Sequence, residues 1–293
     1  MTPSSFFRRA TRRLEKTLSS FFFIDQWVIM TARDAGFNSL QWPMFQPLIP
    51  DKDRYWGDPF VVARDNNFYV FIEEKIYATG LGRIACLTLD REGRLLSNQI
   101  VLERPYHLSY PFIFEQDGET FMVPETAGHR TIELYRCVKF PGQWEFIKTL
   151  LTDIYAVDAT LLNYGNKVWL FTNVKEQGGS SLDALHLYYA PQGPLSDQWT
   201  PHPCNPIVKD IRSARPAGRI FMQDGKLIRP SQDSSRRYGY ALKFNRITTL
   251  DENNYAEVVE TTFKPTGGRM LATHTFNLAG GLTVIDAIIR RRK

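Results

Sequence analysis

The sequence of 293 residues predicts an all-β fold, a five-bladed β-propeller. Three observations lead to this prediction: one hairpin pattern recurs five times, the copies follow one another roughly every 50 residues, and further strand-like segments come after the hairpins. Each hairpin has an apolar run, a polar turn, a second apolar run and a polar end. The five copies are residues 59–73, 111–125, 159–173, 214–233 and 273–287. A β-sandwich, the main alternative, would not explain five similar hairpins.

The segments after the first four hairpins predict two outer strands for each blade. They are residues 82–90 and 98–103, 131–138 and 144–151, 184–190 and 199–203, and 238–247 and 255–260. The fifth hairpin has no such segments after it, but 25–34 and 42–50 resemble a third and a fourth strand. We therefore expect these N-terminal strands to complete the last blade and to close the ring without a long free sheet edge. The predicted propeller spans 23–289.

The composition is that of a folded protein with a sizeable core, since 43% of the residues are hydrophobic and 13% are aromatic. The three cysteines are scattered, which predicts no disulfide framework and fits a reducing compartment. The five histidines are dispersed without ligand spacing. We therefore expect neither a metal nor a cofactor.

The net charge of +5 is concentrated in two short segments. Five basic residues among 8–16, with Glu15, and the four basic residues 290–293 together carry +8, which leaves −3 for the rest of the chain. A broad nucleic-acid surface would need basic groups over the folded body, so we exclude nucleic acid as a partner. The sequence thus divides into a basic segment 1–22, the propeller, and a basic tail 290–293.

The N-terminal segment has the pattern of a short amphipathic helix. Apolar side chains recur at steps of three and four, while arginines occupy much of the other side. An aromatic apolar face beside an arginine-rich face suits an anionic membrane surface, with 6–21 as the contact; packing on the protein's own domain is the alternative. We find no cleavage site typical of a signal peptide. The expectation is a cytoplasmic protein held peripherally at the inner face of the membrane.

The hairpin plan predicts where polar groups gather. The first strand of a propeller blade lines the central channel, and it starts beside the end of the antiparallel second strand. Two rings of residues should therefore meet at one mouth of the channel. The strand starts contribute Asp58, Tyr110, Asp158, Arg215 and His274. The strand ends contribute Glu73 or Glu74, Glu125, Asn173, Gln232 or Asp233, and Asp286. Such a gathering predicts a site for a small polar ligand.

A sugar is the ligand that these residue types favour. Carboxylates accept hydrogen bonds from hydroxyl groups, and Trp56 and Tyr110 can cover the apolar face of a sugar. Glycosidic chemistry needs an ionised carboxylate as base or nucleophile and a protonated carboxyl group as acid. We predict Asp58, Asp158 and Glu125 as the catalytic carboxyl groups, with Glu125 as the acid.

The other positions are predicted to bind substrate. Arg212 and Arg215 can clamp a phosphate or a carboxylate, although structural ion pairs are the alternative. The remaining predicted binding residues are Glu74, Asn173, Gln232, Asp233 and His274. Structural roles stay open for the acidic positions as well, because an aspartate before a proline, such as Asp58, often caps a strand or a turn.

Several motifs together resemble one known family. They are "WGDPFVV", "YPFIFEQDGETFMVPET", "DATLL", "WLFTN", "HPCNPIVKDIRSARPAGRIF", "LIRPSQD" and "ATHTF". The sequence over 25–289 resembles the propeller domain at the N-terminus of plant glucosamine inositolphosphorylceramide transferases, which has stand-alone bacterial relatives. More distantly it is similar to five-bladed glycosidases of the arabinanase and invertase type. That similarity implies that Asp58 is the base or nucleophile and that Asp158 orients and tunes it.

Three functions follow from these features. The first is a glycosyltransferase in the synthesis of cell-envelope glycan, polysaccharide or glycolipid, acting on a sugar that is nucleotide- or lipid-linked. The second is a glycoside hydrolase, and the third is a non-catalytic sugar-binding or scaffold propeller. The glycosidases carry their acid in a later blade, where this sequence has Arg215, Gln232 and Asp233. That difference favours the glycosyltransferase.

Overall fold

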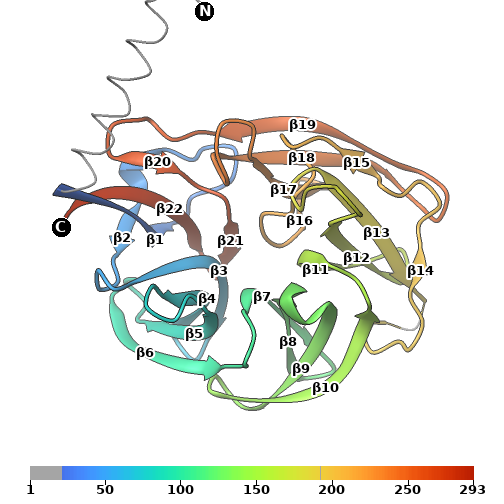
Figure 1. The fold of residues 1–293 in the computed structure, drawn as a ribbon, viewed down its shortest axis with the longest axis horizontal. Coiled ribbons are helices and arrows are strands. Elements are labelled where there is room, and N and C mark those ends of the chain that lie inside the picture. The colour runs from blue at the N-terminus through green and yellow to red at the C-terminus, as the bar shows by residue number, and fades with distance from the viewer. Residues whose placement is uncertain (1–21, 192) are drawn as a thin grey trace, which may run out of the picture.

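The computed structural model describes residues 22–191 and 193–293, and in these residues five sheets surround a central channel (Figure 1). The predicted class, a five-bladed β-propeller, is confirmed. Each of the first four blades is a sheet whose strands pair in chain order from the channel outward. The expected hairpins form the inner two strands because their continuous apolar runs suit strands that are buried on both faces between neighbouring blades.

The strands of the blades have the following bounds. Blade one consists of β3 (Arg54–Arg64), β4 (Asn67–Ile76), β5 (Gly82–Leu89) and β6 (Leu95–Leu102). Blade two consists of β7 (Ser109–Gln116), β8 (Glu119–Thr126), β9 (Thr131–Lys139) and β10 (Gln143–Thr152). Blade three consists of β11 (Ala156–Tyr164), β12 (Lys167–Val174), β13 (Ala184–Ala190), β14 (Thr200–Pro201) and β15 (Val208–Lys209). Blade four consists of β16 (Phe221–Gln223), β17 (Lys226–Asp233), β18 (Ala241–Leu250) and β19 (Tyr255–Phe263). The short 3-10 helices are η1 (Trp42–Met44) and η2 (Ala127–His129).

Blade five joins the two ends of the described chain, as predicted. Its inner part is β20 (Met270–Ala272) and β21 (Phe276–Ala279), both paired with β22 (Leu282–Arg292). The outer strands are β1 (Phe23–Arg33) and β2 (Gln46–Leu48). The β1–β22 pairing runs without a break from Phe23 opposite Arg292 to Arg33 opposite Leu282. This long antiparallel pairing closes the ring.

The basic tail predicted at 290–293 is mostly strand instead. β22 continues through Arg292, and the Arg290 Nε lies 2.8 Å from Asp25 Oδ1 on β1. Arg291 donates to the side chain of Gln26 and to the carbonyl of Pro50. These partners supply the pairing that a charge-rich tail lacks by itself. The predicted amphipathic segment lies outside the described residues except for Phe22.

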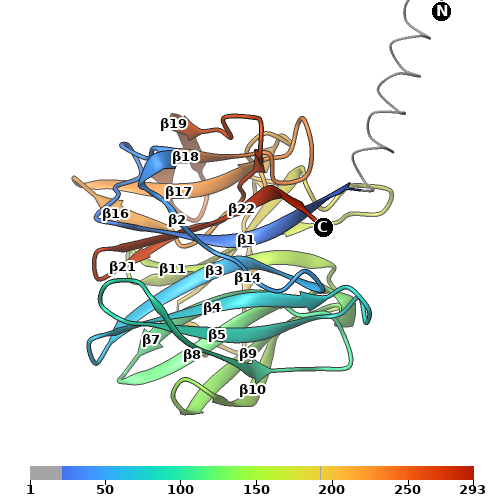
Figure 2. The same cartoon turned by 90° about the vertical axis from the view of Figure 1, so that its left-hand side faces the viewer.

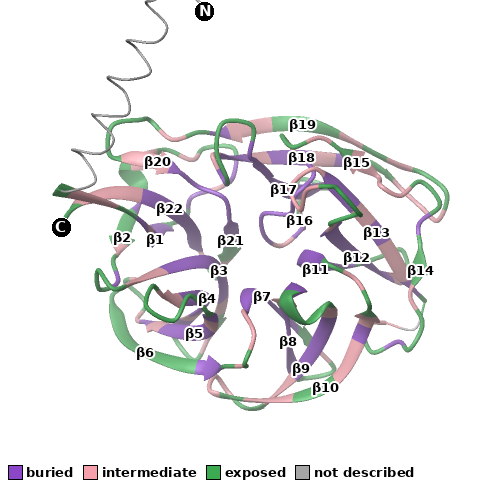
Figure 3. Cartoon of the chain, in the orientation of Figure 1, coloured by how far each residue is buried: buried purple, intermediate pink, exposed green. Residues whose placement is uncertain are grey.

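The core lies between the blades. Four clusters of buried apolar residues fill the spaces between blades. The first runs through blades one, two and three, and the others join blade three to four, blade four to five, and blade five to one. Burial therefore falls from the channel-facing strands to the outer strands, as Figure 3 shows. Among the described residues, no helix is long and apolar enough to cross a membrane.

The first strands of blades one to three share a backbone irregularity. The pairing shifts register between Gly57 and Phe60, and equivalent shifts follow in blades two and three. Asp58, Tyr110 and Asp158 lie in these shifts with positive φ angles of 51°, 42° and 56°. Such a conformation costs on the order of 1 kcal/mol or more for a residue other than glycine. The same bulge therefore places the first residue of each of these three hairpins at the channel mouth.

Candidate functional site at the channel mouth

Asp58 lies where blade one meets blade five, and only 5% of its surface is exposed. Its Oδ1 accepts a hydrogen bond from the hydroxyl of Thr275 at 3.0 Å, and its Oδ2 accepts one from the backbone nitrogen of Tyr110 at 3.3 Å. Burial raises the pKa of the Asp58 carboxyl group to about 7, although nearby His274 opposes this effect. Asp58 is therefore a carboxyl group that can take up or release a proton near neutral pH.

His274 is held in place by Asp286. Its Nδ1 lies 2.5 Å from Asp286 Oδ2, and the backbone nitrogens of His274 and Thr275 donate to Asp286 Oδ1. The imidazole also stacks on Trp27, with ring centroids 4.1 Å apart. Burial lowers the pKa of His274, but Asp286 more than offsets burial and raises it to about 9. A protonated imidazole thus faces Asp58, with His274 Nε2 lying 3.7 Å from Asp58 Oδ1.

Asp58, His274 and Asp286 offer three ligand atoms within 4.8 Å of one another, which is a spacing that a metal ion could use. Here His274 and Asp286 form an ion pair, and Asp286 Oδ2 also accepts a hydrogen bond from the backbone nitrogen of Asp58. A metal ion at this position would have to replace the contact between His274 Nδ1 and Asp286 Oδ2 and to displace the proton of the imidazole.

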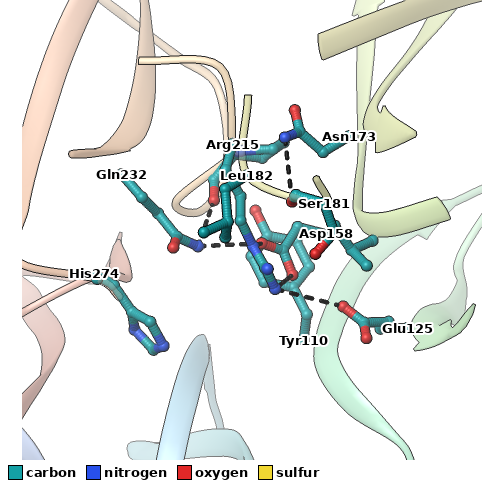
Figure 4. A network of polar contacts seen from close by, with 12 residues as sticks. Tyr110, Glu125, Asp158, Asn173, Ser181, Leu182, Arg215, Gln232 and His274 are labelled. Carbon is teal, nitrogen blue, oxygen red and sulfur yellow. Dashed lines mark hydrogen bonds and ion pairs between the residues drawn. The ribbon is translucent and has the colours of Figure 1, made fainter. Parts of the chain in front are cut away.

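Asp158 forms the second centre, at the opposite side of the mouth. It is 1% exposed and receives hydrogen bonds from Arg215 Nε at 2.6 Å and from Gln232 Nε2 at 3.0 Å. Arg215 Nη2 also lies 3.7 Å from Glu125 Oε2, as Figure 4 shows. Burial raises the pKa of Glu125 well above its usual value, and the charge of Asp158 adds to this shift. Glu125 therefore holds its proton more tightly than an ordinary carboxyl group does, although the charge of Arg215 opposes this shift.

Asn173 and a neighbouring loop complete this side of the mouth. The Asn173 amide donates to the carbonyl of Ser181 at 3.2 Å (Figure 4). This bond attaches residues 178–183 to the polar side chains at the channel mouth, which we call the ring from here on. Among the described residues, Glu125 Oε2, Asn173 Oδ1 and Gln232 Oε1 are buried without a hydrogen-bond donor. These three positions are the equivalent ends of the second strands in blades two, three and four. Buried acceptors without donors are costly, so they suit a ligand that donates hydrogen bonds.

Tyr110 reaches the ring but is fully buried and has a supporting role there. Its hydroxyl accepts a hydrogen bond from the backbone nitrogen of Gly218 at 2.7 Å and lies 2.9 Å from the hydroxyl of Thr160. Its ring packs edge-on against Phe60. Tyr110 therefore ties blades one to four together below the site, and its aromatic face is not open to a sugar.

Four predicted binding residues lie away from this cluster. Trp56 is buried between blades one and five and donates to Glu74 Oε2, so it cannot cover a ligand. Glu74 pairs with Arg54 and Arg83 beside β4, and the adjacent Glu73 is the one that accepts from Tyr55. The placement of Trp56 and Glu74 corrects the prediction.

The other two are Arg212 and Asp233. Arg212 is exposed and forms a two-point ion pair with Asp210. Asp233 Oδ1 accepts from the backbone nitrogen and hydroxyl of Ser235. Arg212 and Asp233 are therefore bonded to residues close to them in the sequence. At the end of β17 it is Gln232 whose side chain reaches Asp158.

Sequence reasoning missed Tyr238 and Trp27. The Arg215 guanidinium lies 5.2 Å from the centroid of the Tyr238 ring, which also packs edge-on against His274 and Trp27. Tyr238 thus contacts both polar clusters, the one around Asp158 through Arg215 and the one around Asp58 through His274. It lies in the loop between β17 and β18, although the sequence predicts a strand over 238–247; the strand begins only at Ala241. The comparison of hairpins therefore gave Tyr238 no place at the channel mouth.

A cavity of about 170 Å³ lies toward the other end of the channel. Phe112, Leu161 and Arg219 are among its lining residues, and Arg219 Nη2 donates to the carbonyl of Ile113. The predicted polar groups of the mouth do not line this cavity. At the mouth itself they are covered by Tyr238 and their own partners, so a ligand has to reach them past the loops.

Fold and site together define a five-bladed propeller whose channel mouth holds two carboxyl-centred polar clusters. The chain belongs to the family of the N-terminal domain of glucosamine inositolphosphorylceramide transferase 1, whose model matches residues 48–270. It is 34% identical over 235 residues to the enzyme of that name from rice (Oryza sativa subsp. japonica), and 32% identical over 229 residues to that from Arabidopsis thaliana. These alignments cover 75% and 74% of this chain but only 31% and 30% of the plant proteins.

Several solved structures with a similar fold are glycoside hydrolases. A family 117 glycoside hydrolase of Zobellia galactanivorans superposes with a TM-score of 0.58 over 90% of both chains, at 11% identity. The GH43_1 enzyme of Xanthomonas citri gives a TM-score of 0.59 over 83% of this chain and 88% of its own, at 10% identity. Identity this low supports the fold alone.

Proposed function

We propose that this protein is a carbohydrate-active enzyme that transfers a glycosyl group at the channel mouth. One observation carries the proposal: Asp58, which is buried, and Glu125, which is partly buried, have raised pKa values and lie in one ring with the Asp158–Arg215 ion pair between blades three and four. A carboxyl group that titrates near pH 7 and another whose pKa lies well above its usual value can serve as the base and the acid that glycosyl chemistry needs.

The reaction assigns one proton to each carboxyl group. Asp58 takes the proton from the acceptor hydroxyl, whose oxygen forms the new bond to the anomeric carbon. The bond from that carbon to the leaving oxygen breaks, and Glu125 donates its proton to the leaving oxygen. Asp158 holds Arg215 within reach of Glu125, so Asp158 positions the acid instead of exchanging a proton itself.

The ring selects for ligands that donate hydrogen bonds. Its carboxyl groups are those of Asp58, Glu73, Glu125, Asp158 and Asp286. The basic groups, Arg215 and His274, are already bound to carboxylates. A hydroxyl or an amine finds acceptors here, whereas a phosphate would meet carboxylates. A phosphate of a nucleotide- or lipid-linked sugar is therefore accommodated only beside Glu125 and Arg215, where the leaving oxygen has to lie.

Transfer is favoured over hydrolysis because the reacting groups are buried. Asp58, the proposed base, and Asp158, which positions the acid, are buried and so shield the site from bulk water, and water is the competitor that turns transfer into hydrolysis. The names of the plant relatives indicate a glycolipid product for those proteins. For this chain we propose a role in the synthesis of cell-envelope glycan or glycolipid. Hydrolysis is the second candidate, since the same acid and base would act with water as acceptor.

The test is a thermal-shift panel of nucleotide sugars, free nucleotides, amino sugars and oligosaccharides. A ligand that binds only the folded state raises the melting temperature. We expect one sugar-containing class to stabilise the native protein, and Asp58→Asn to fold but lose this response. The matched control is Asp117→Asn, since Asp117 also has a positive φ but lies exposed in a hairpin turn.

The outcomes separate the candidates. Stabilisation by a nucleotide sugar, lost in Asp58→Asn and kept in Asp117→Asn, supports transfer and identifies the donor. Release of free sugar from a glycan that stabilises the protein would replace transfer by hydrolysis. An Asp58→Asn protein that unfolds, or one that keeps the full ligand response, contradicts a catalytic Asp58.

A further inference from the structure

The pairing of β1 with β22 produces a projection on the face that carries the site. Asp286 pairs with Ile29 at the level of the ring, and β22 continues six residues further to Arg292. Six extended residues span about 20 Å. By contrast, β8 ends one residue after its ring residue, Glu125. Figure 2 shows the start of β1 and the end of β22 together at one side of the propeller.

The projection is basic and carries an exposed aromatic residue. Arg292 and Lys293 are exposed beside Phe22, whose carbonyl accepts from the Lys293 backbone nitrogen at 2.9 Å. Exposed Arg269 lies next to it, since its carbonyl accepts from the Arg290 backbone. Nearby Asp25 is already paired with Arg290.

The loop after β17 extends this basic region across the mouth. Its Gly239 carbonyl accepts from the Thr273 backbone, and Tyr238 packs against Trp27 on β1. Arg236 and Arg237 in this loop are exposed. Other loops that join second to third strands, or one blade to the next, lie on the same face. They present exposed apolar side chains, namely those of Ile49, Tyr77, Leu81, Tyr155 and Ile211.

We propose that this face docks on an anionic lipid membrane, so that the channel mouth faces the lipid surface. Clustered basic groups with interspersed aromatic and aliphatic side chains are what an anionic bilayer interface binds. The basic residues among 8–16 precede Phe22 in the chain. The β1–β22 pairing places Phe22, where the described chain begins, beside the basic residues Arg292 and Lys293 at its other end.

This docking fixes an orientation that a tail alone would not give. The ring around Asp58 and Asp158 lies beneath Tyr238 between the projection and the apolar loops, so a sugar linked to a lipid would approach the site past these loops without leaving the membrane surface. The docking face does not depend on the reaction at the ring. Vesicle binding can therefore succeed or fail without deciding whether sugar is transferred.

The first experiment is flotation of the full chain with vesicles of phosphatidylcholine, with and without about 30% phosphatidylglycerol. We expect binding only to the anionic vesicles. The variant Arg237→Glu/Lys293→Glu should bind at least about tenfold more weakly, because two attractive charges become repulsive. The matched control is Arg91→Glu/Lys139→Glu, an equal charge change at the opposite face, in the turn after β5 and at the exposed end of β9, and it should bind within about twofold of the native protein.

The second experiment measures orientation with an environment-sensitive fluorophore on a single introduced cysteine. Exposed Cys204 is first replaced by serine. A label at Tyr77→Cys should shift to shorter wavelength on anionic vesicles, whereas a label at Met222→Cys, on the opposite face, should not. Equal loss of binding in both charge-reversal pairs, equal shifts at both labels, or equal binding to neutral vesicles would each overturn the proposal.

Discussion

The guanidinium of Arg215 and the carboxylate of Asp158 form a buried ion pair that joins blade four to blade three across the channel mouth. Nε lies 2.6 Å from Oδ2, and Nη2 lies 3.3 Å from Oδ1. Asp158 has one further donor, the amide of Gln232. The pair therefore fixes two blades and positions Glu125 through the same guanidinium.

Removing one partner of this pair should be costly. Arg215→Met leaves the carboxylate of Asp158 buried without its counter-ion, and we expect the free energy of unfolding to fall by about 3–5 kcal/mol. The double variant Asp158→Asn/Arg215→Met should recover much of this loss, because no charge is left unpaired. Urea denaturation at pH 7 measures both values. Arg212→Met, at an exposed pair, is the control and should change stability little. A loss in Arg215→Met as small as that of the control would contradict the role of the pair.

The pair of His274 and Asp286 predicts a fall in stability above neutral pH. The folded-state pKa of His274, about 9, exceeds its ordinary value of 6.5. Its stabilising contribution is therefore complete below pH 6.5 and is lost as the pH rises through 9. The shift corresponds to on the order of 3 kcal/mol. Asp58 also binds its proton more tightly when folded, but its contribution is lost between pH 3.8 and about 7, so it does not obscure the later step.

Thermal denaturation between pH 6 and pH 9.5 checks this prediction. Asp286→Asn removes the largest contribution that raises the pKa of His274, so the variant should be less stable at pH 6 and its stability should change little between 6.5 and 9. Asp25→Asn, which breaks the exposed pair with Arg290, is the control and should keep the native pH dependence. An unchanged slope in Asp286→Asn would show that another group titrates.

The fold could be predicted because a repeat supplies five independent copies of one pattern. The absence of outer strands after the fifth hairpin was enough to assign 25–34 and 42–50 to its blade. The course of residues 290–292 could not be predicted, since four consecutive basic residues have the composition of a solvated tail. Their strand partners, Asp25 and Gln26, are distant in sequence and are found only once β1 and β22 pair.

The site was predictable where equivalent positions of the repeat face the channel, as for Asp58 and Asp158. Which of two neighbouring residues faces the channel could not be predicted, because neighbouring residues of a strand face opposite sides. Glu73 and Glu74 differ in this way, and only the register of β3 with β4 separates them. Tyr238 could not be found from strand patterns, since its place over Arg215 depends on the path of a loop.

Gly218 gives a test of how closely the blades approach beneath the site. Its φ is +127°, and a Cβ at this position would lie 2.0 Å from the carbonyl oxygen of Phe276 on blade five. Its backbone nitrogen also donates to the hydroxyl of Tyr110. Gly218→Ala must therefore push blades four and five apart, and we expect a loss of more than about 3 kcal/mol in the free energy of unfolding.

The matched control is Gly225→Ala. Gly225 also has a positive φ, +71°, but a Cβ there would meet no atom within 4 Å. Only the backbone strain remains, so the loss should be about 1 kcal/mol. Urea denaturation of both variants gives the comparison. If Gly218→Ala costs no more than Gly225→Ala, then the contact with Phe276 yields easily, and the ring below Asp58 and Asp158 is not held by close packing. A larger loss for Gly218→Ala shows that the site rests on a rigid junction of blades.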